Sequence, residues 1–177
     1  MTRGLERWHA SGLAHFLTFS CYQRRPYLRD KQCCDAVLAA LEAARLRFSM
    51  RVYGYVVMPE HVHLLLSEPE RGTLADVMHF MKLSSAKRLR LMRSERGETG
   101  SLWQKRYYDR NLRSYDDFVE KLRYIHRNPV KRGLVAKPED WTWSSFAHYA
   151  TGARGAVEVE SERAAQKRTG RRLEDPG

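Results

Sequence analysis

Two histidines in the segment Met-Pro-Glu-His-Val-His-Leu-Leu-Leu, residues 58–66, are the side chains best suited to chemistry. The apolar run around them predicts a buried strand, and successive side chains of a strand alternate between its two faces. His61 and His63 should therefore project from the same face, where neutral imidazoles could hold a metal ion. Half-buried histidines of an ordinary hairpin would show the same spacing, and a metal site would need a third ligand from elsewhere in the chain.

A second segment, residues 102–113, mixes cations with aromatic rings and reads Leu-Trp-Gln-Lys-Arg-Tyr-Tyr-Asp-Arg-Asn-Leu-Arg. Cationic side chains can bind phosphates while bases stack on neighbouring rings, which makes this segment a candidate contact with nucleic acid. An ordinary amphipathic edge strand would have the same composition. The candidate DNA contacts in this segment are Trp103, Lys105, Arg106 and Tyr107.

Other candidate DNA contacts lie in loops and on one predicted helix. Arg24 and Arg25 precede Pro26, which should end the first strand, although a solvated loop explains the two arginines equally well. Arg88 lies at the edge of the apolar face of a helix, so either its stem is buried with the charged head in water or it points into a ligand groove. The set is completed by Lys82, Lys131 and Arg132.

The charge of the chain favours a polyanionic partner. Its 177 residues include 32 Lys and Arg against 21 Asp and Glu, a net charge of +11, with a pI near 9.9. No apolar run approaches the roughly 18 residues of a membrane span, and the N-terminal residues lack the apolar core of a signal peptide. We therefore expect a soluble intracellular protein, with reduced, structural cysteines.

The hydrophobic patterns predict the order strand, helix, strand, strand, helix, strand. Asp30 and the pair Thr73 and Asp76 are placed to cap the two helices. This order is that of an α+β, ferredoxin-like fold, an antiparallel βαββαβ sheet with both helices on one face. The histidines would face either those helices or the open side of the sheet. The predicted strands are 13–22, 51–58, the histidine segment and part of 102–113, and the helices are 31–48 and 73–93.

A third helix, C-terminal to the sheet, is predicted over about residues 115–128 after the capping pair Ser114 and Asp117. Tyr124 and Asn128 lie four residues apart and therefore share one face of this helix, whereas His126 projects to a different side. The proline that follows Asn128 disfavours continuation of the helix.

The domain organisation follows from where apolar residues stop. From about residue 151 onward, apolar bulk nearly vanishes and Arg, Lys, Glu and Gly take over. We therefore expect one domain over residues 1–150 and a flexible charged C-terminal tail over residues 151–177.

Four motifs occur in order along the chain: Pro-Glu-His-Val-His at 59–63, Trp-Gln-Lys-Arg-Tyr-Tyr-Asp at 103–109, Tyr-Ile-His-Arg-Asn-Pro-Val-Lys-Arg-Gly-Leu-Val at 124–135, and Trp-Ser-Ser-Phe at 143–146. Together they resemble the REP-associated tyrosine transposases, which are single-tyrosine members of the HUH enzymes. The resemblance covers about residues 8–150 and leaves the tail without a counterpart.

The resemblance implies an active site of four side chains. His61 and His63 would bind a divalent metal, Mg²⁺ or Mn²⁺, with Asn128 as the third ligand, and Tyr124 would attack single-stranded DNA. The product would be a 5′-phosphotyrosine and a free 3′-OH, which can attack back and rejoin strands without ATP. The implied partner is DNA with REP-like hairpins, bound by a monomer or a homodimer in the bacterial cytoplasm, at the nucleoid.

Two other functions stay open at this point. A ferredoxin-like domain could bind nucleic acid as a non-catalytic regulator with a vestigial metal site, although the intact set of four side chains speaks against it. A metal-dependent hydrolase would use metal-bound water and would not need Tyr124. Two neighbouring residues also have alternatives: His126 is structural or contacts DNA, and Glu60 is a turn residue or a partner of His61.

Overall fold

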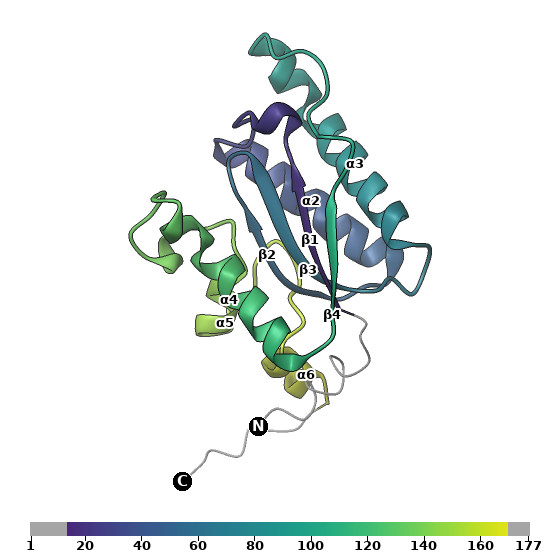
Figure 1. The fold of residues 1–177 in the computed structure, drawn as a ribbon, viewed down its shortest axis with the longest axis vertical. Coiled ribbons are helices and arrows are strands. Elements are labelled where there is room, and N and C mark those ends of the chain that lie inside the picture. Colours follow the sequence, from purple (N-terminus) through teal and green to yellow (C-terminus); the bar gives the residue numbers. More distant parts are fainter. Residues whose placement is uncertain (1–13, 170–177) are drawn as a thin grey trace.

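The computed structural model describes residues 14–169 and has a four-stranded sheet at its centre (Figure 1). The strand order is β2-β3-β1-β4, and all three pairings are antiparallel. The predicted α+β fold with βαββαβ order is confirmed. The elements are β1 (Ala14–Ser20), η1 (Tyr22–Arg24), α2 (Lys31–Phe48), β2 (Val52–Val57), β3 (His61–Ser67), α3 (Leu74–Glu95), β4 (Tyr108–Leu112), α4 (Tyr115–Lys131), η2 (Pro138–Asp140), α5 (Phe146–Thr151) and α6 (Glu162–Thr169).

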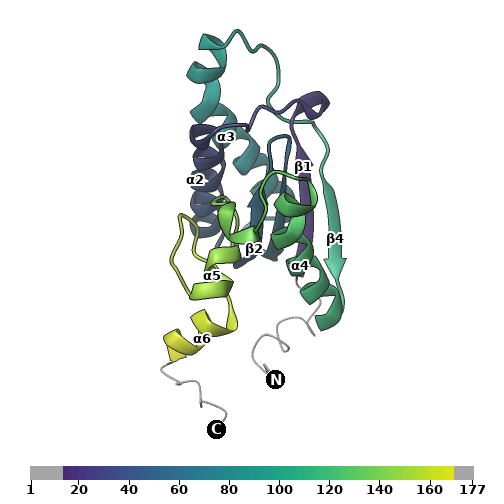
Figure 2. The same ribbon diagram turned by 90° about the vertical axis from the view of Figure 1, so that its left-hand side faces the viewer.

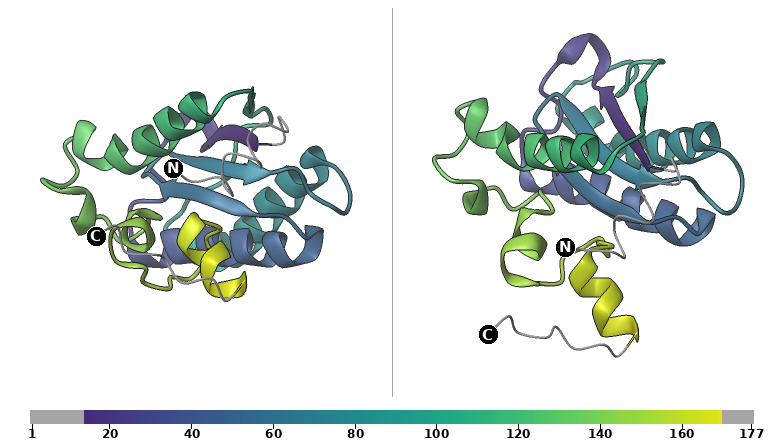
Figure 3. Two further views of the ribbon diagram at one scale, coloured as in Figure 1. Left: turned by 90° about the horizontal axis from the view of Figure 1, so that it is seen from below. Right: turned by 60° about the horizontal axis from the view of Figure 1, so that its bottom comes forward.

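Helices cover both faces of the sheet, as Figures 2 and 3 show. α2 and α3 pack against each other on one face, and α4 lies across the other. The histidines of β3 project toward α4, which decides between the two faces that the sequence leaves open. No helix within residues 14–169 is both long and apolar enough to cross a membrane.

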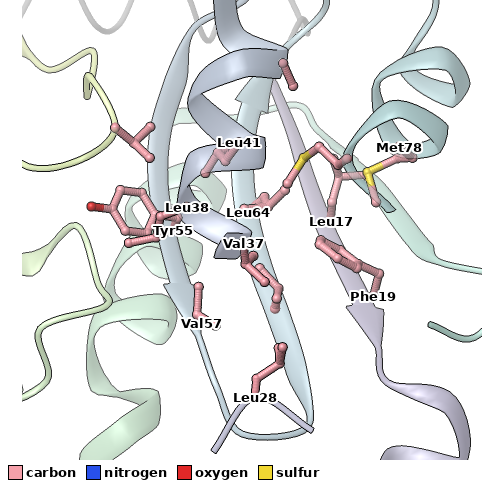
Figure 4. Packing of buried hydrophobic residues seen from close by; sticks show 14 of the residues in the cluster. Leu17, Phe19, Leu28, Val37, Leu38, Leu41, Tyr55, Val57, Leu64 and Met78 are labelled. Atoms are coloured by element: carbon pink, nitrogen blue, oxygen red, sulfur yellow. The ribbon is translucent and has the colours of Figure 1, made fainter. Parts of the chain in front are cut away.

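Alternation along the strands divides the core into two layers. Leu17 and Phe19 of β1 pack with the apolar face of α2, where Val37 lies (Figure 4). On the other face, Phe16 belongs to a smaller layer that includes Phe118 of α4. The smaller layer seats α4 on the sheet and therefore positions the candidate site.

The predicted helix starts are confirmed by their capping contacts. The carboxylate of Asp30 accepts a hydrogen bond from a backbone N–H of the first turn of α2. Thr73 and Asp76 form a reciprocal capping box at the start of α3, and the Ser114 hydroxyl accepts a hydrogen bond from the first turn of α4. These contacts satisfy backbone donors that have no partner inside a helix.

Helix α4 continues past the point where the sequence predicts its end. It runs to Lys131 and contains Pro129 in its last turn. A proline removes one backbone N–H donor, and near a helix end this leaves only one carbonyl without its helical partner. The backbone N–H of Arg132 still donates to the carbonyl of Asn128 at 2.9 Å, and the N–H of Leu134 to that of Pro129, also at 2.9 Å.

The segment after residue 150 differs from the predicted tail, because it packs against the domain as far as Ser161. Val157 and Val159 are buried. Val159 forms a parallel bridge with Val52 at the outer edge of β2, and the backbone N–H of Glu160 donates to the carbonyl of Val52 at 2.8 Å. An unpaired sheet edge offers hydrogen-bonding groups to any segment, so few apolar residues are needed to dock one. The predicted tail residues 170–177 lie outside the described residues.

The cysteines are packing residues, as the sequence predicts. Cys21, Cys33 and Cys34 are buried and form no disulfide. Burial raises the pKa of the Cys21 thiol to about 12. A thiol that is protonated and inaccessible is a poor nucleophile and a poor metal ligand.

Candidate active site

The two histidines lie side by side at the start of β3. His61 is 3% exposed and His63 is 5% exposed, and their Nε2 atoms are 3.0 Å apart. Thr18 of β1 stands opposite His63 in the sheet, and the Thr18 hydroxyl oxygen is 2.7 Å from Nδ1 of His63. Strand alternation thus brings both imidazoles to one point, as predicted.

Each imidazole also has a polar partner at its Nδ1 atom. Nδ1 of His61 lies 3.0 Å from a carboxylate oxygen of Glu60, which can only accept, so Nδ1 carries the proton. Burial lowers the pKa of His61 despite the nearby Glu60, and burial, with the neighbouring His61, lowers the pKa of His63 to about 3. Both rings are therefore neutral at pH 7. When the Thr18 hydroxyl accepts a hydrogen bond from Nδ1 of His63, the Nε2 atoms of the two histidines carry lone pairs that face and repel each other. A cation between these lone pairs would be attracted to both.

Helix α4 brings Tyr124 and Asn128 to the histidines. Asn128 is 4% exposed, and its Nδ2 lies 3.4 Å from Nε2 of His63. The ring of Tyr124 is 5.2 Å from the ring of His63, centroid to centroid, and the tyrosine is 38% exposed. The predicted helix face therefore presents a buried amide to the histidine pair and a solvent-accessible phenol beside it.

Gly54 of β2 leaves space that a leucine side chain of α4 fills. A Cβ atom at Gly54 would lie 2.7 Å from Cδ1 of Leu122. Phe118 and Ile125, on the same side of α4, are fully buried. This apolar layer holds α4 on the strands and thus positions its side chains near β3.

His126 lies on α4 but takes no part in this cluster. It is buried, with Nε2 2.8 Å from the Ser145 hydroxyl. That hydroxyl also accepts the backbone N–H of Tyr55 at 3.0 Å. Burial lowers the pKa of His126 to about 4. Of the two roles that the sequence leaves open, these contacts favour the structural one.

The donors around the histidine pair fit a divalent metal ion. Oδ1 of Asn128 is buried and, among the described residues, has no hydrogen-bond partner. A half-turn of the amide exchanges Oδ1 and Nδ2 and would direct the oxygen toward His63. In residues 14–169, side chains of His, Cys, Asp and Glu alone form no group of three that could hold a metal. The third donor next to the two imidazoles is the Asn128 amide.

Glu60 connects the histidine strand to two arginines. Its Oε1 lies 2.7 Å from the Arg132 guanidinium and 3.6 Å from that of Arg24. Burial alone would raise the pKa of the Glu60 carboxyl, but His61 and Arg132 hold it below its ordinary value. The glutamate is thus an ionised partner of His61 rather than a simple turn residue. The sequence analysis placed Arg24 and Arg132 as candidate DNA contacts, not as partners of Glu60, and the one signal for this cluster is an acid directly before the first histidine.

Two of the predicted DNA contacts are engaged inside the protein. Trp103 is 7% exposed and donates from Nε1 to the Ser85 hydroxyl at 3.0 Å, so its ring cannot stack on a base. The Lys82 ammonium donates to the carbonyls of Gln104 and Lys105 at 2.9 and 3.1 Å, which ties this segment to α3. The other predicted contacts, besides Arg24 and Arg132, are exposed or half-buried: Arg25, Arg88, Lys105, Arg106, Tyr107 and Lys131.

Comparison with known proteins assigns this fold and site to a class. The family model described as Transposase IS200 like matches residues 10–128. A Haemophilus influenzae protein assigned as a REP-associated tyrosine transposase is 33% identical over 144 residues, covering 76% of this chain and 80% of that protein. The REP-associated tyrosine transposase of Escherichia coli K12 is 26% identical, with 87% of each chain covered. The chain is a tyrosine transposase, an enzyme class that cleaves and rejoins DNA. It belongs to the REP-associated tyrosine transposases.

Solved structures share the fold. A REP-associated tyrosine transposase bound to a REP hairpin matches with a TM-score of 0.65 at 21% identity, covering 85% of this chain and 87% of that chain. A Deinococcus radiodurans protein assigned as a transposase matches with a TM-score of 0.50 at 22% identity, covering 64% of this chain and 88% of that chain. At these identities the likeness shows the fold alone.

Proposed function

We propose that this chain is a metal-dependent endonuclease and strand transferase for single-stranded DNA that carries REP-like hairpins. The observation that carries the proposal is the meeting of Tyr124 and Asn128 with the His61 and His63 pair on one face of the sheet. The related structure bound to a REP hairpin supports the same kind of partner. The named relatives come from bacteria, so the DNA would be that of the bacterial cytoplasm.

Tyr124 supplies the nucleophile in this proposal. Its phenol oxygen attacks the phosphorus, and the bond from phosphorus to the 3′ oxygen breaks. This gives a 5′-phosphotyrosine and a free 3′-OH. Because the covalent link keeps the energy of the phosphodiester, a 3′-OH can attack it, rejoin the strands and release the phenol. A metal held by His61, His63 and Asn128 would make the phosphate more electrophilic and neutralise its developing charge.

The surrounding side chains orient these groups. Glu60 and Thr18 hold the imidazoles so that both Nε2 lone pairs point at one place. Two imidazoles and one amide leave coordination positions for phosphate oxygens and water, which fits Mg²⁺ or Mn²⁺. A guanidinium carries five N–H donors, so Arg24 and Arg132 can bind a phosphate while they pair with Glu60.

The test is a covalent adduct. The protein, incubated in Mn²⁺ with a labelled hairpin oligonucleotide that carries a single-stranded flank, should give a protein–DNA adduct on a denaturing SDS gel. Tyr124→Phe should abolish adduct and cleavage and leave binding nearly unchanged, because it removes one oxygen and no positive charge. Tyr108→Phe is the matched control and should keep the adduct. Tyr108 is 54% exposed and stands opposite Thr18 in β4.

Three results would contradict the proposal in different ways. Cleavage without an adduct, retained in Tyr124→Phe, would indicate a hydrolase that uses metal-bound water. Hairpin binding with no cleavage in Mg²⁺ or Mn²⁺ would indicate a non-catalytic regulator. An adduct that persists in Tyr124→Phe and is lost in Tyr108→Phe would show that Tyr108, and not Tyr124, is the nucleophile.

A further inference from the structure

A groove of about 1000 Å³ runs along α3, which covers the sheet face opposite to α4. The segment between α3 and β4 forms its second wall, and Tyr22 of η1 completes the lining. Figure 1 shows η1 close to this segment, beyond one end of the sheet. The backbone N–H of Tyr22 donates to the carbonyl of Leu102 at 2.9 Å, which holds η1 against this segment. The Lys82 ammonium, which donates to the carbonyls of Gln104 and Lys105, ties the segment to α3.

The groove is lined with cations. Lys87, Arg90 and Lys105 are exposed side chains in its lining. Among the described lining residues the one carboxylate is Glu98, and it already pairs with Arg93. The groove therefore attracts an anion, and the spread of its charges along a helix and a loop suits an extended polyanion.

Arg93 adds a buried charge to one wall. It is 7% exposed, its guanidinium lies 4.7 Å from the centre of the Tyr27 ring, and Nη1 donates to the Gly100 carbonyl at 3.2 Å. Among the described residues, its Nη2 has no hydrogen-bond partner. Glu98 balances the charge of Arg93, but the buried Nη2 donor still costs free energy unless it gains a hydrogen bond.

Apolar and aromatic surface lies between these cations. Leu83 is 61% exposed and Tyr22 is 47% exposed, and both line the groove with Ala86 and Leu102. Phosphate or an acidic peptide needs only the cations. Nucleobases also bury flat apolar faces against rings and aliphatic side chains. The bases of a duplex are stacked on each other, so only unpaired bases can offer those faces.

The groove is connected to the candidate active site through η1. Arg24, two residues after Tyr22, reaches Glu60, the carboxylate beside His61. Gln23 and Arg24 both have positive φ, 54° and 52°, a conformation that is uncommon for residues other than glycine. This bend lets one short segment present Tyr22 to the groove and Arg24 to the site.

We infer that the groove binds the single-stranded flank of the hairpin, with phosphates on Lys87, Arg90 and Lys105 and an unpaired base on Tyr22. The inference rests on the proposed function and assigns a binding site to the part of that substrate that lies outside the active site. The hairpin stem would then contact other basic surface, and the flank would lie in the groove and pass η1 to the site.

The experiment measures hairpin binding by fluorescence anisotropy in a Tyr124→Phe background, so that no DNA is cleaved. The double variant Lys87→Ala/Arg90→Ala is compared with Arg71→Ala/Arg154→Ala, which removes the same charge. Arg71 and Arg154 are exposed and do not line the groove. Two lost single-strand contacts should reduce the log–log salt slope by about 1.4, so between 50 and 200 mM salt the variant should lose about sevenfold less affinity than the parent. The control should keep the parent slope.

A second pair of variants tests the stacked base. Tyr22→Ala should raise the Kd of the flanked hairpin about fivefold or more, whereas Tyr22→Phe keeps the ring and should bind like the parent. For a hairpin without a flank, all variants should have the same Kd. Equal losses with and without the flank would show that the groove holds the stem instead, and equal losses in the Arg71/Arg154 control would show a general charge effect. Either result, or no loss at all, overturns the inference. If the wild type gives no adduct but this binding pattern appears, the groove assignment stands and the proposed chemistry fails.

Discussion

Replacement of Glu60 should weaken metal binding although Glu60 is not itself a metal ligand. Its side chain is 11% exposed, lies 3.0 Å from Nδ1 of His61 and pairs with Arg132 at 2.7 Å. Glu60→Ala leaves the Nδ1 proton without an acceptor and leaves two guanidiniums near the metal ligands without their counter-charge. Loss of such a partner typically costs about 10- to 100-fold in metal affinity, which corresponds to about 1.4 to 2.7 kcal/mol.

Two further variants separate the hydrogen bond from the charge. Glu60→Gln keeps an oxygen that can accept the Nδ1 proton but loses the negative charge, so its loss should be near the tenfold end of the range. Arg132→Ala removes the ion pair and leaves the contact between Glu60 and His61. We expect it to bind metal as well as the wild type or slightly better, because a cation near the metal site is gone, and to bind DNA less tightly.

The assay is calorimetric titration of Mn²⁺ into each protein without DNA, with thermal unfolding to check the fold. Wild-type Mn²⁺ affinity in a folded Glu60→Ala protein would refute the argument that Glu60 fixes the His61 tautomer. If Glu60→Ala does not fold, the near-isosteric Glu60→Gln protein carries the same test. Equal losses in Glu60→Gln and Arg132→Ala would show that the ion pair, and not the histidine contact, matters for the metal.

Three other outcomes are expected from the same geometry. His61→Ala and His63→Ala should each abolish cleavage in Mn²⁺ while the thermal unfolding transition stays cooperative; cleavage that survives in EDTA would exclude a metal role. Asn128→Ala should be milder, because water can replace a neutral amide, and should raise the Mn²⁺ concentration for half-maximal cleavage; complete loss at saturating Mn²⁺ would contradict this. Hairpins with a single-stranded flank should be cleaved better than fully paired counterparts, since a paired strand blocks access to Tyr124, and equal cleavage would show that the substrate form is wrong.

Each half of the site could be predicted from sequence because each depends on a local pattern. Strand alternation places His61 and His63 on one face, and helix periodicity does the same for Tyr124 and Asn128. The approach of the two pairs depends on α4 packing against the open face of the sheet, and no local pattern specifies that packing. Only the resemblance joined the four residues before their contacts were seen.

Tertiary contacts of single side chains were harder to predict, since their partners lie far away in the sequence. Trp103 and Lys82 have the composition of a DNA-binding surface, yet their partners are Ser85 and backbone carbonyls. Val157 and Val159 form too sparse a pattern to predict packing, and they dock because the edge of β2 offers backbone hydrogen bonds. In both cases a tertiary contact decides the outcome. Residue type alone could not distinguish a DNA contact from a packed side chain, or a flexible tail from a docked segment.

The nucleophile and the histidines come from different layers, so their separation depends on how α4 is seated on the sheet. The apolar side chains of Phe118, Leu122 and Ile125 seat the helix on the strands, and the half-exposed pair of Arg132 with Glu60, just before β3, adds a weaker contact. Tyr124 and Asn128 lie between Leu122 and Arg132 along the helix. The extra turn after Pro129 supplies the second contact, because a helix that ended at residue 128 would not carry Arg132 on its C-terminal cap. A helix held on both sides of Tyr124 can leave that tyrosine open to a DNA strand and still keep it at a constant distance from His63.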